Sequence, residues 1–252
     1  MTRKRLLVLV ALLAVAVSAA RAQAAARAQV TVYAAASLTG VFPKIDAGER
    51  YSFGGSNTLA AQIQQGAPAD VFASANTTLP NQLYAKGLCS KPVVFTRNTL
   101  VIVIPKATST GIHSIYDLTK PGVKIDIAAS GVPVGSYTLQ ILKNMNLSTA
   151  VLKNVVSQET DVREVLSKVA LGEADAGFVY STDAKTVPGK VTVVKIPAWA
   201  QPKVQYGICI VSASANKADG QAFVNRVLAK AGQVKLLAAG FLPRSKPVVK
   251  KK

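Results

Sequence analysis

The stretch Tyr33-Ala34-Ala35-Ala36-Ser37-Leu38-Thr39 ends an apolar strand and opens a helix with small and hydroxyl-bearing residues. Three more stretches repeat this design: F-G-G-S-N-T-L at 53–59, V-P-V-G-S-Y at 132–137 and E-T-D-V-R at 159–163. A helix N-terminus presents unpaired backbone N–H groups and a partial positive charge. Several such ends aimed at one point would bind an anion without Lys or Arg. The alternative is that each is an ordinary helix N-cap.

The N-terminal region of the 252-residue chain predicts export. A basic segment, 1–5, precedes an apolar run, 6–17, and small-x-small cleavage patterns end at Ala22 and Ala28. About 12 apolar residues are too few to span a bilayer. We therefore expect residues 1–28 to be a signal peptide, cleaved near 22 or 28, and the mature protein to be periplasmic. A secreted or envelope-associated protein is the alternative, and no Cys follows the run to carry a lipid anchor.

The formal net charge is +18, and four of the basic residues lie within the first 22 positions. Apart from a basic tail, 242–252, the other charges are scattered and do not cluster with aromatic residues. This distribution is typical of a solvated surface, so nucleic acid is not an expected partner.

Few residues are available for metal or nucleophilic chemistry. His113 is the only histidine, which argues against a zinc site and against a Ser-His-Asp triad. The two cysteines, Cys89 and Cys209, leave two readings open, a disulfide in an oxidising compartment or buried free thiols.

Strands and helices alternate along the chain, which predicts an α/β fold with mainly parallel sheets covered by helices. The two series of elements predict two lobes joined by hinge strands near 100–105 and 206–211. Strands are expected at 29–34, 51–53, 70–73, 100–104, 123–128, 154–157, 175–179, 191–194 and 204–211. The expected division is lobe one at 29–103, lobe two at 104–208, and a return to lobe one at 209–241.

Two further motifs, G-A-P-A-D-V-F at 66–72 and G-E-A-D-A-G-F-V-Y-S-T-D-A at 172–184, extend the pattern. Together with the four stretches above, they resemble the molybdate-binding proteins of bacterial ABC importers. The similarity runs in order from about Val30 to Phe241. It implies a type II periplasmic-binding-protein fold, in which two lobes close on a tetrahedral oxyanion.

The resemblance also implies which residues contact that oxyanion. Ser37 and Ser56 would donate hydroxyl hydrogen bonds from lobe one. Val134 and Val162 would donate backbone N–H groups from lobe two, and Tyr180 a hydroxyl. Read alone, Val162 is simply the first core residue of a helix and Tyr180 a core tyrosine at a strand end. Because no carboxylate stands at 134 or 162, we expect a four-coordinate oxyanion, with no direct protein–metal ligand and no cofactor.

The expected function is therefore that of a monomeric receptor, not an enzyme, that binds molybdate or tungstate and delivers it to an ABC permease. A sulfate or phosphate receptor is an alternative within the same class. An enzyme using Ser37 or Ser56 as nucleophile would need a base that the neighbouring sequence lacks. A basic envelope-binding protein is the remaining alternative.

Overall fold

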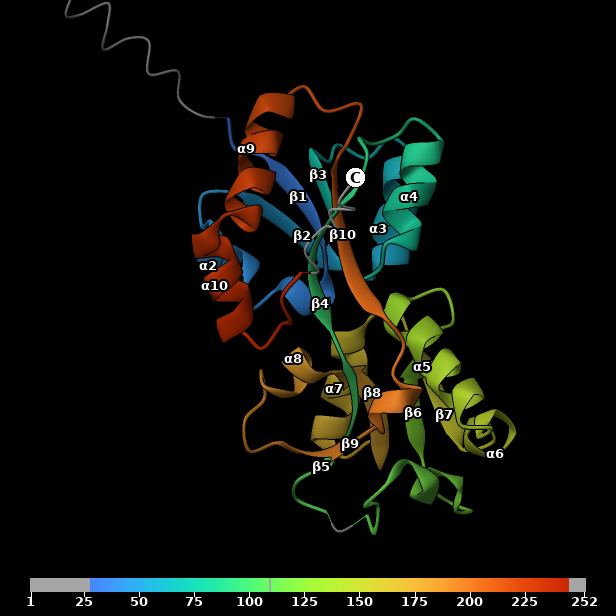
Figure 1. Ribbon diagram of the computed structural model, residues 1–252. Helices are drawn as coiled ribbons and strands as arrows, with labels where there is room; N and C mark the ends of the chain where they lie inside the picture. Colours follow the sequence, from blue (N-terminus) through green and yellow to red (C-terminus); the bar gives the residue numbers. More distant parts are fainter. Residues whose placement is uncertain (1–27, 109, 245–252) are drawn as a thin grey trace, which may run out of the picture.

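The computed structural model describes residues 28–108 and 110–244, which form two lobes, each built on a five-stranded sheet (Figure 1). The predicted signal peptide falls almost entirely outside the described residues, and so does most of the basic tail. Within these ranges, no helix combines the length and the apolar character needed to cross a membrane.

The sheet of lobe one has the order β2-β1-β3-β10-β4. Its strands are β1 (Thr31–Ala35), β2 (Arg50–Gly54), β3 (Val71–Ser74), β4 (Val93–Asn98) and β10 (Val204–Ile210). β1 pairs in parallel with β2 and β3, whereas β10 runs antiparallel to both β3 and β4. No strand is predicted at β4, and its second half, Thr96 to Asn98, is polar.

The sheet of lobe two has the order β7-β6-β8-β5-β9 and repeats this plan. Its strands are β5 (Leu100–Pro105), β6 (Ile125–Ala128), β7 (Val155–Glu159), β8 (Ala176–Tyr180) and β9 (Val191–Lys195). β6 is parallel to β7 and β8, and β5 is antiparallel to β8 and β9. Each sheet therefore has four strands in one direction and one reversed strand, which fits the predicted mainly parallel sheets.

The chain changes lobes earlier than the sequence analysis places the boundaries. β5 pairs only within the second sheet, so residues 100–103 belong to lobe two. β10 pairs only within the first sheet, so residues 204–208 belong to lobe one. The crossings are therefore Thr99 and the segment between β9 and β10. A continuous apolar run such as β5 does not reveal which of two sheets it joins, and this explains the difference.

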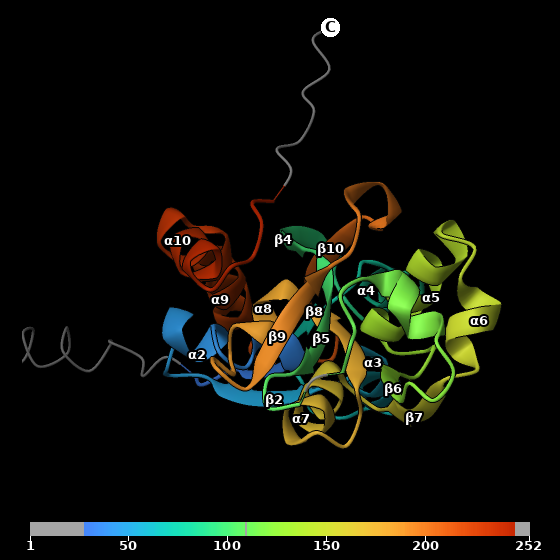
Figure 2. The same ribbon diagram turned by 90° about the horizontal axis from the view of Figure 1, so that it is seen from below.

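Helices cover both faces of each sheet. In lobe one, α9 and α10 lie on the side of the molecule opposite α3 and α4 (Figure 1). Seen from below, α5 and α6 of lobe two lie on the far side from α9 and α10 (Figure 2). The helices of lobe one are η1 (Ala36–Leu38), α2 (Phe42–Ile45), α3 (Ser56–Gln64), α4 (Thr78–Ala85), α9 (Lys217–Leu228) and α10 (Lys230–Ala238). Lobe two has η2 (Ile115–Thr119), α5 (Pro133–Asn144), α6 (Ser148–Leu152), α7 (Val162–Leu171) and α8 (Ser181–Ala184), and η3 (Ala198–Ala200) lies in the second crossing.

Buried aliphatic and aromatic side chains pack between each sheet and its helices. A smaller cluster in lobe one holds both cysteines, which are free thiols in this structure. Cys89 and Cys209 are 3% and 2% exposed, so they pack as small apolar side chains beneath α3 and α4.

Candidate functional site

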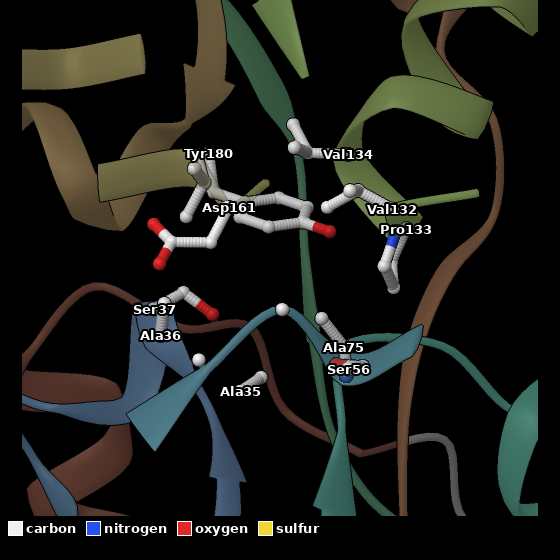
Figure 3. A pocket seen from close by; sticks show the side chains of 13 residues that line it. Ala35, Ala36, Ser37, Ser56, Ala75, Val132, Pro133, Val134, Asp161 and Tyr180 are labelled. Carbon is white, nitrogen blue, oxygen red and sulfur yellow. Dashed lines mark hydrogen bonds between the residues drawn. The ribbon is translucent and has the colours of Figure 1, made fainter. Parts of the chain in front are cut away.

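A small cavity lies between the two lobes, with a volume of about 10 Å³. It is far too small for a drug-sized ligand. All five residues that the sequence predicts for the site line it: Ser37, Ser56, Val134, Val162 and Tyr180. Figure 3 shows Ser37 and Ser56 on the side of lobe one, facing Tyr180 and Val134 of lobe two.

The lobe-one wall is made by the ends of β1 and β2. Ser37 lies inside η1 and Ser56 is the first residue of α3, so neither serine is the N-cap that the alternative reading expects. The N-caps are Ala35 and Gly55, and neither donates or accepts a side-chain cap bond. Both serine hydroxyls are therefore available for other partners.

Each serine hydroxyl is held from behind by one protein group. The Ser56 Oγ, in a residue 1% exposed, accepts the backbone N–H of Ala75 at 3.1 Å. The Ser37 Oγ lies 2.9 Å from the hydroxyl of Tyr206. Because a hydroxyl has one hydrogen and two lone pairs, Ser56 can still donate its hydrogen into the cavity.

The lobe-two wall contains the N-termini of two helices. α5 begins with Pro133 after Val132, which makes no side-chain cap bond. The N–H of Val134 is among the first-turn donors that have no partner within the helix. α7 begins at Val162 and is capped by Asp161, whose carboxylate accepts the N–H groups of Arg163 and Glu164 at 2.7 and 3.2 Å.

Tyr180 projects from the end of β8 into the cavity and is only 1% exposed. Its hydroxyl oxygen has no hydrogen-bond partner among the described residues. Burial raises the pKa of Tyr180 well above its ordinary value, so the phenol stays protonated and remains a donor. A buried polar group without a partner costs about 1–3 kcal/mol, so this hydroxyl is a candidate donor to a bound ligand.

The cavity contains no cationic side chain among the residues that line it. Its charged member is Asp161, and Asp183 lies close behind Tyr180. Asp183 accepts the Tyr180 N–H at 3.2 Å, and burial raises its pKa to about 7. The donors that face the cavity are thus neutral hydroxyls and backbone N–H groups.

Main-chain atoms of the two lobes meet beside the cavity. A Cβ placed on Gly55 of lobe one would lie 2.3 Å from the carbonyl oxygen of Thr160 in lobe two. Only glycine permits so close an approach, so this structure has the lobes closed on each other at this edge.

The arrangement can bind a species that only accepts hydrogen bonds, since it offers donors from both lobes. Within the described residues, no group of His, Cys, Asp and Glu is placed to hold a metal ion directly. His113 does not line the cavity, and the residues that line it include no histidine or lysine beside the serines.

Three neighbours of the site escaped the sequence analysis: Asp161 as a wall residue, Gly55 as a contact point, and Tyr206 behind Ser37. Tyr206 lies 169 positions from Ser37, in an apolar strand that carries no local sign of the contact. For Asp161, its place directly before Val162 is a usable signal.

Comparison with known proteins agrees with this architecture. Residues 13–242 match the family model described as bacterial extracellular solute-binding protein. The chain belongs to this family. It is 39% identical over 224 residues to the molybdate-binding protein ModA of Mycobacterium tuberculosis, a match that covers 84% of each chain. It is also 34% identical over 231 residues to ModA of Haemophilus influenzae, covering 84% of this chain and 89% of the relative.

Among solved structures, the periplasmic molybdate-binding protein of Azotobacter vinelandii superposes with a TM-score of 0.75 at 24% identity. That match covers 86% of this chain and all of the neighbour. This chain therefore has the two-lobed type II periplasmic-binding fold that the sequence predicts.

Proposed function

We propose that this protein is an extracytoplasmic receptor that binds molybdate, and also tungstate, and delivers it to an ABC permease. The observation that carries the proposal is the partnerless hydroxyl of Tyr180 at a small interlobe cavity whose other donors are also neutral. The similarity to molybdate-binding relatives supports the choice of ion.

The proposed contacts divide between the lobes. Ser37 and Ser56 donate hydroxyl hydrogens from lobe one, while Val134, Val162 and Tyr180 donate from lobe two. A tetrahedral dianion has only acceptor oxygens, so it can use every one of these donors. Neutral donors avoid the desolvation of a buried Lys or Arg, and they leave selection to the size of the cavity. Binding therefore holds the two lobes together in a closed state.

The remaining parts of this function are proposals from the sequence. The protein acts as a monomer in the periplasm after removal of the signal peptide, with no nucleic acid and no cofactor. It is not an enzyme, in keeping with its membership of a solute-binding family and with a cavity whose lining holds no histidine or lysine.

A phosphate receptor is the second candidate, and one observation favours it. The carboxylate of Asp161 belongs to a residue of the cavity wall, and a carboxylate can accept the hydrogen that phosphate carries near neutral pH. Sulfate, which carries no hydrogen, shares the donor requirements of molybdate and is separated from it by size alone.

A thermal-shift panel on the mature chain tests the proposal. An ion at 100 times its Kd adds about 2.7 kcal/mol of stability, or roughly 5–10 °C in Tm for a chain of this size. We expect that shift with molybdate and tungstate and none with sulfate or phosphate at the same concentration. A shift with phosphate or sulfate but none with molybdate would reject the molybdate assignment and favour the other oxyanion.

A further inference from the structure

A chain of buried hydrogen bonds runs behind Ser37 to the junction between the lobes. The Ser37 Oγ lies 2.9 Å from the hydroxyl of Tyr206, and that hydroxyl lies 3.4 Å from the Asn98 Nδ2. The same nitrogen lies 2.9 Å from the Thr182 Oγ1. All four residues are buried, with Tyr206 at 0% and Asn98 at 3% exposure. The direction of each hydrogen bond in this chain can be worked out from its far end.

The orientation of the Asn98 amide fixes that direction. Its Oδ1 accepts the backbone N–H of Thr99 at 2.9 Å and the hydroxyl of Ser181 at 3.0 Å. A backbone N–H can only donate, so the atom facing it must be the amide oxygen. The NH2 group of Asn98 therefore faces Thr182 and Tyr206 and donates to both.

The NH2 group of Asn98 also influences the direction of the hydrogen bond between Tyr206 and Ser37. Because the Tyr206 oxygen accepts from Asn98, its own hydrogen is free to point toward the Ser37 Oγ. The opposite arrangement, in which Ser37 donates to Tyr206, would turn the Tyr206 hydrogen toward the neighbouring hydroxyl of Tyr180 and would take the serine hydrogen away from the cavity. Burial also raises the pKa of Tyr206 well above its ordinary value, so that hydrogen is present at every physiological pH.

We propose that Asn98 and Tyr206 are positioning residues that hold Ser37 as a hydrogen-bond donor toward the bound oxyanion. Tyr206 satisfies one lone pair of Ser37, which leaves the serine hydrogen to point into the cavity. Hydrogen bonds aligned in one direction polarise each other, so the chain also strengthens the final donor. This inference rests on the proposed oxyanion-binding function and deepens it.

The place of Asn98 extends the inference to both lobes. Asn98 ends β4 at the crossing into lobe two, and its amide contacts Ser181 and Thr182, which follow Tyr180 directly. One side chain therefore connects the serine donor of lobe one with the turn that carries the tyrosine donor of lobe two. The two donors have a common support at the hinge.

A double-mutant cycle tests the positioning role. Molybdate affinity is measured by calorimetric titration for the wild type, Tyr206→Phe, Ser37→Ala and the double variant, together with the Tm of each ion-free protein. We expect Tyr206→Phe to weaken binding about tenfold, because it removes the group that orients a charge-assisted donor. In the Ser37→Ala background, the same change should weaken binding less than about twofold.

Tyr51→Phe is the matched control. Its hydroxyl also lies in lobe one and donates to the carbonyl oxygens of Phe42 and Asp46, away from the cavity. We expect this variant to lower the Tm while leaving molybdate affinity unchanged. A second cycle, which pairs Asn98→Ala with Ser37→Ala, should show the same non-additivity and guards against a Tyr206 variant that folds poorly.

The outcomes separate the two proposals. If the wild type binds molybdate but the Tyr206 and Ser37 losses simply add, the positioning role is wrong and the receptor function stands. Unchanged affinity in Tyr206→Phe would have the same meaning. If the wild type does not bind molybdate, both proposals fail together.

Discussion

Helices α5 and α7 begin at the same cavity, yet only α7 has a side chain that caps its first turn. Val132 precedes α5 and offers no side-chain cap, whereas Asp161 precedes α7 and its carboxylate accepts two first-turn N–H groups. An N-cap side chain contributes about 1 kcal/mol to stability. α5 therefore forgoes that contribution and keeps its donors available, while α7 keeps only the N–H of Val162 for a ligand. The comparison separates donors used for stability from donors used for binding.

The largest expected effect comes from giving α5 the kind of cap that α7 has. Val132→Asp should place a carboxylate at the cavity wall, where it takes the first-turn N–H groups and repels a dianion in a low-dielectric site. We expect loss of molybdate binding by more than about a hundredfold in a protein that remains folded, because the new cap offsets part of the lost apolar burial. Calorimetric titration and circular dichroism measure the two properties.

Val132→Asn is the matched control, since Asn caps a helix as well as Asp but carries no charge. It should retain far more affinity than Val132→Asp. Equal affinities in the two variants would mean that the uncapped end of α5 does not face the ion.

The next effect concerns the remaining donor of lobe two. Tyr180→Phe should weaken molybdate binding by roughly ten- to a hundredfold, because a charge-assisted hydrogen bond is worth roughly 1.5–3 kcal/mol. The ion-free protein should not lose stability, since within residues 28–108 and 110–244 the hydroxyl meets the criteria for a hydrogen bond with no protein group. Titration and ion-free melting decide the matter. A fall in Tm with unchanged affinity would instead identify a structural core tyrosine.

A smaller effect is expected when the α7 cap loses only its charge. Asp161→Asn keeps an acceptor for Arg163 and Glu164, so the ion-free Tm should stay nearly constant. Removing one negative charge from the cavity wall should tighten molybdate binding a few-fold, and the gain should shrink with added salt. Unchanged affinity at low and high salt would show that this carboxylate is neutralised or turned away from the ion.

The smallest effect touches stability alone and involves the carboxylates beneath α7. Asp126 is 1% exposed, its two oxygens face no hydrogen-bond donor among the described residues, and it lies beside Glu159, which pairs with Lys168 at 2.5 Å. Burial first, and then the charge of Glu159, raises the pKa of Asp126 from 3.8 to about 7. The folded state thus holds more protons than the unfolded chain between about pH 4 and pH 7.

Stability should therefore fall as the pH rises through that window, with Asp183 acting in the same direction. Asp126→Asn should flatten this slope and raise the Tm at pH 8 by a few degrees, corresponding to roughly 1 kcal/mol. Melting curves from pH 4 to pH 8 provide the measurement. An unchanged slope would mean that Asp126 is ionised in the folded protein.

The helix starts at the cavity could be predicted from the sequence because they are local patterns. An apolar strand followed by small or hydroxyl residues announces the turn, and resemblance to a family assigns Ser37, Ser56, Val134, Val162 and Tyr180 to one place. The structure brings these five residues around one cavity. The pattern does not decide whether a serine caps its helix. In the structure Gly55 is the N-cap of α3 and Ser56 is the first helical residue.

The parts that escaped prediction depend on contacts between distant segments. Asn98 and Tyr206 meet across 108 positions, and neither stands in a motif. The crossing at Thr99 was misplaced for a similar reason, since β4 and β5 are separated by one residue and only strand pairing shows that they join different sheets.

The contact between Gly55 and the carbonyl group of Thr160 limits how closely the two lobes can approach each other. Because main-chain atoms meet there, the distance between the cavity walls has a lower limit that no rotamer can change. When an oxyanion smaller than this gap binds, the cavity walls cannot close further around it. Some of the donors then stay too far from its oxygens to form hydrogen bonds. The two lobes therefore select an oxyanion by its size, and the residue that limits how far they close is a glycine.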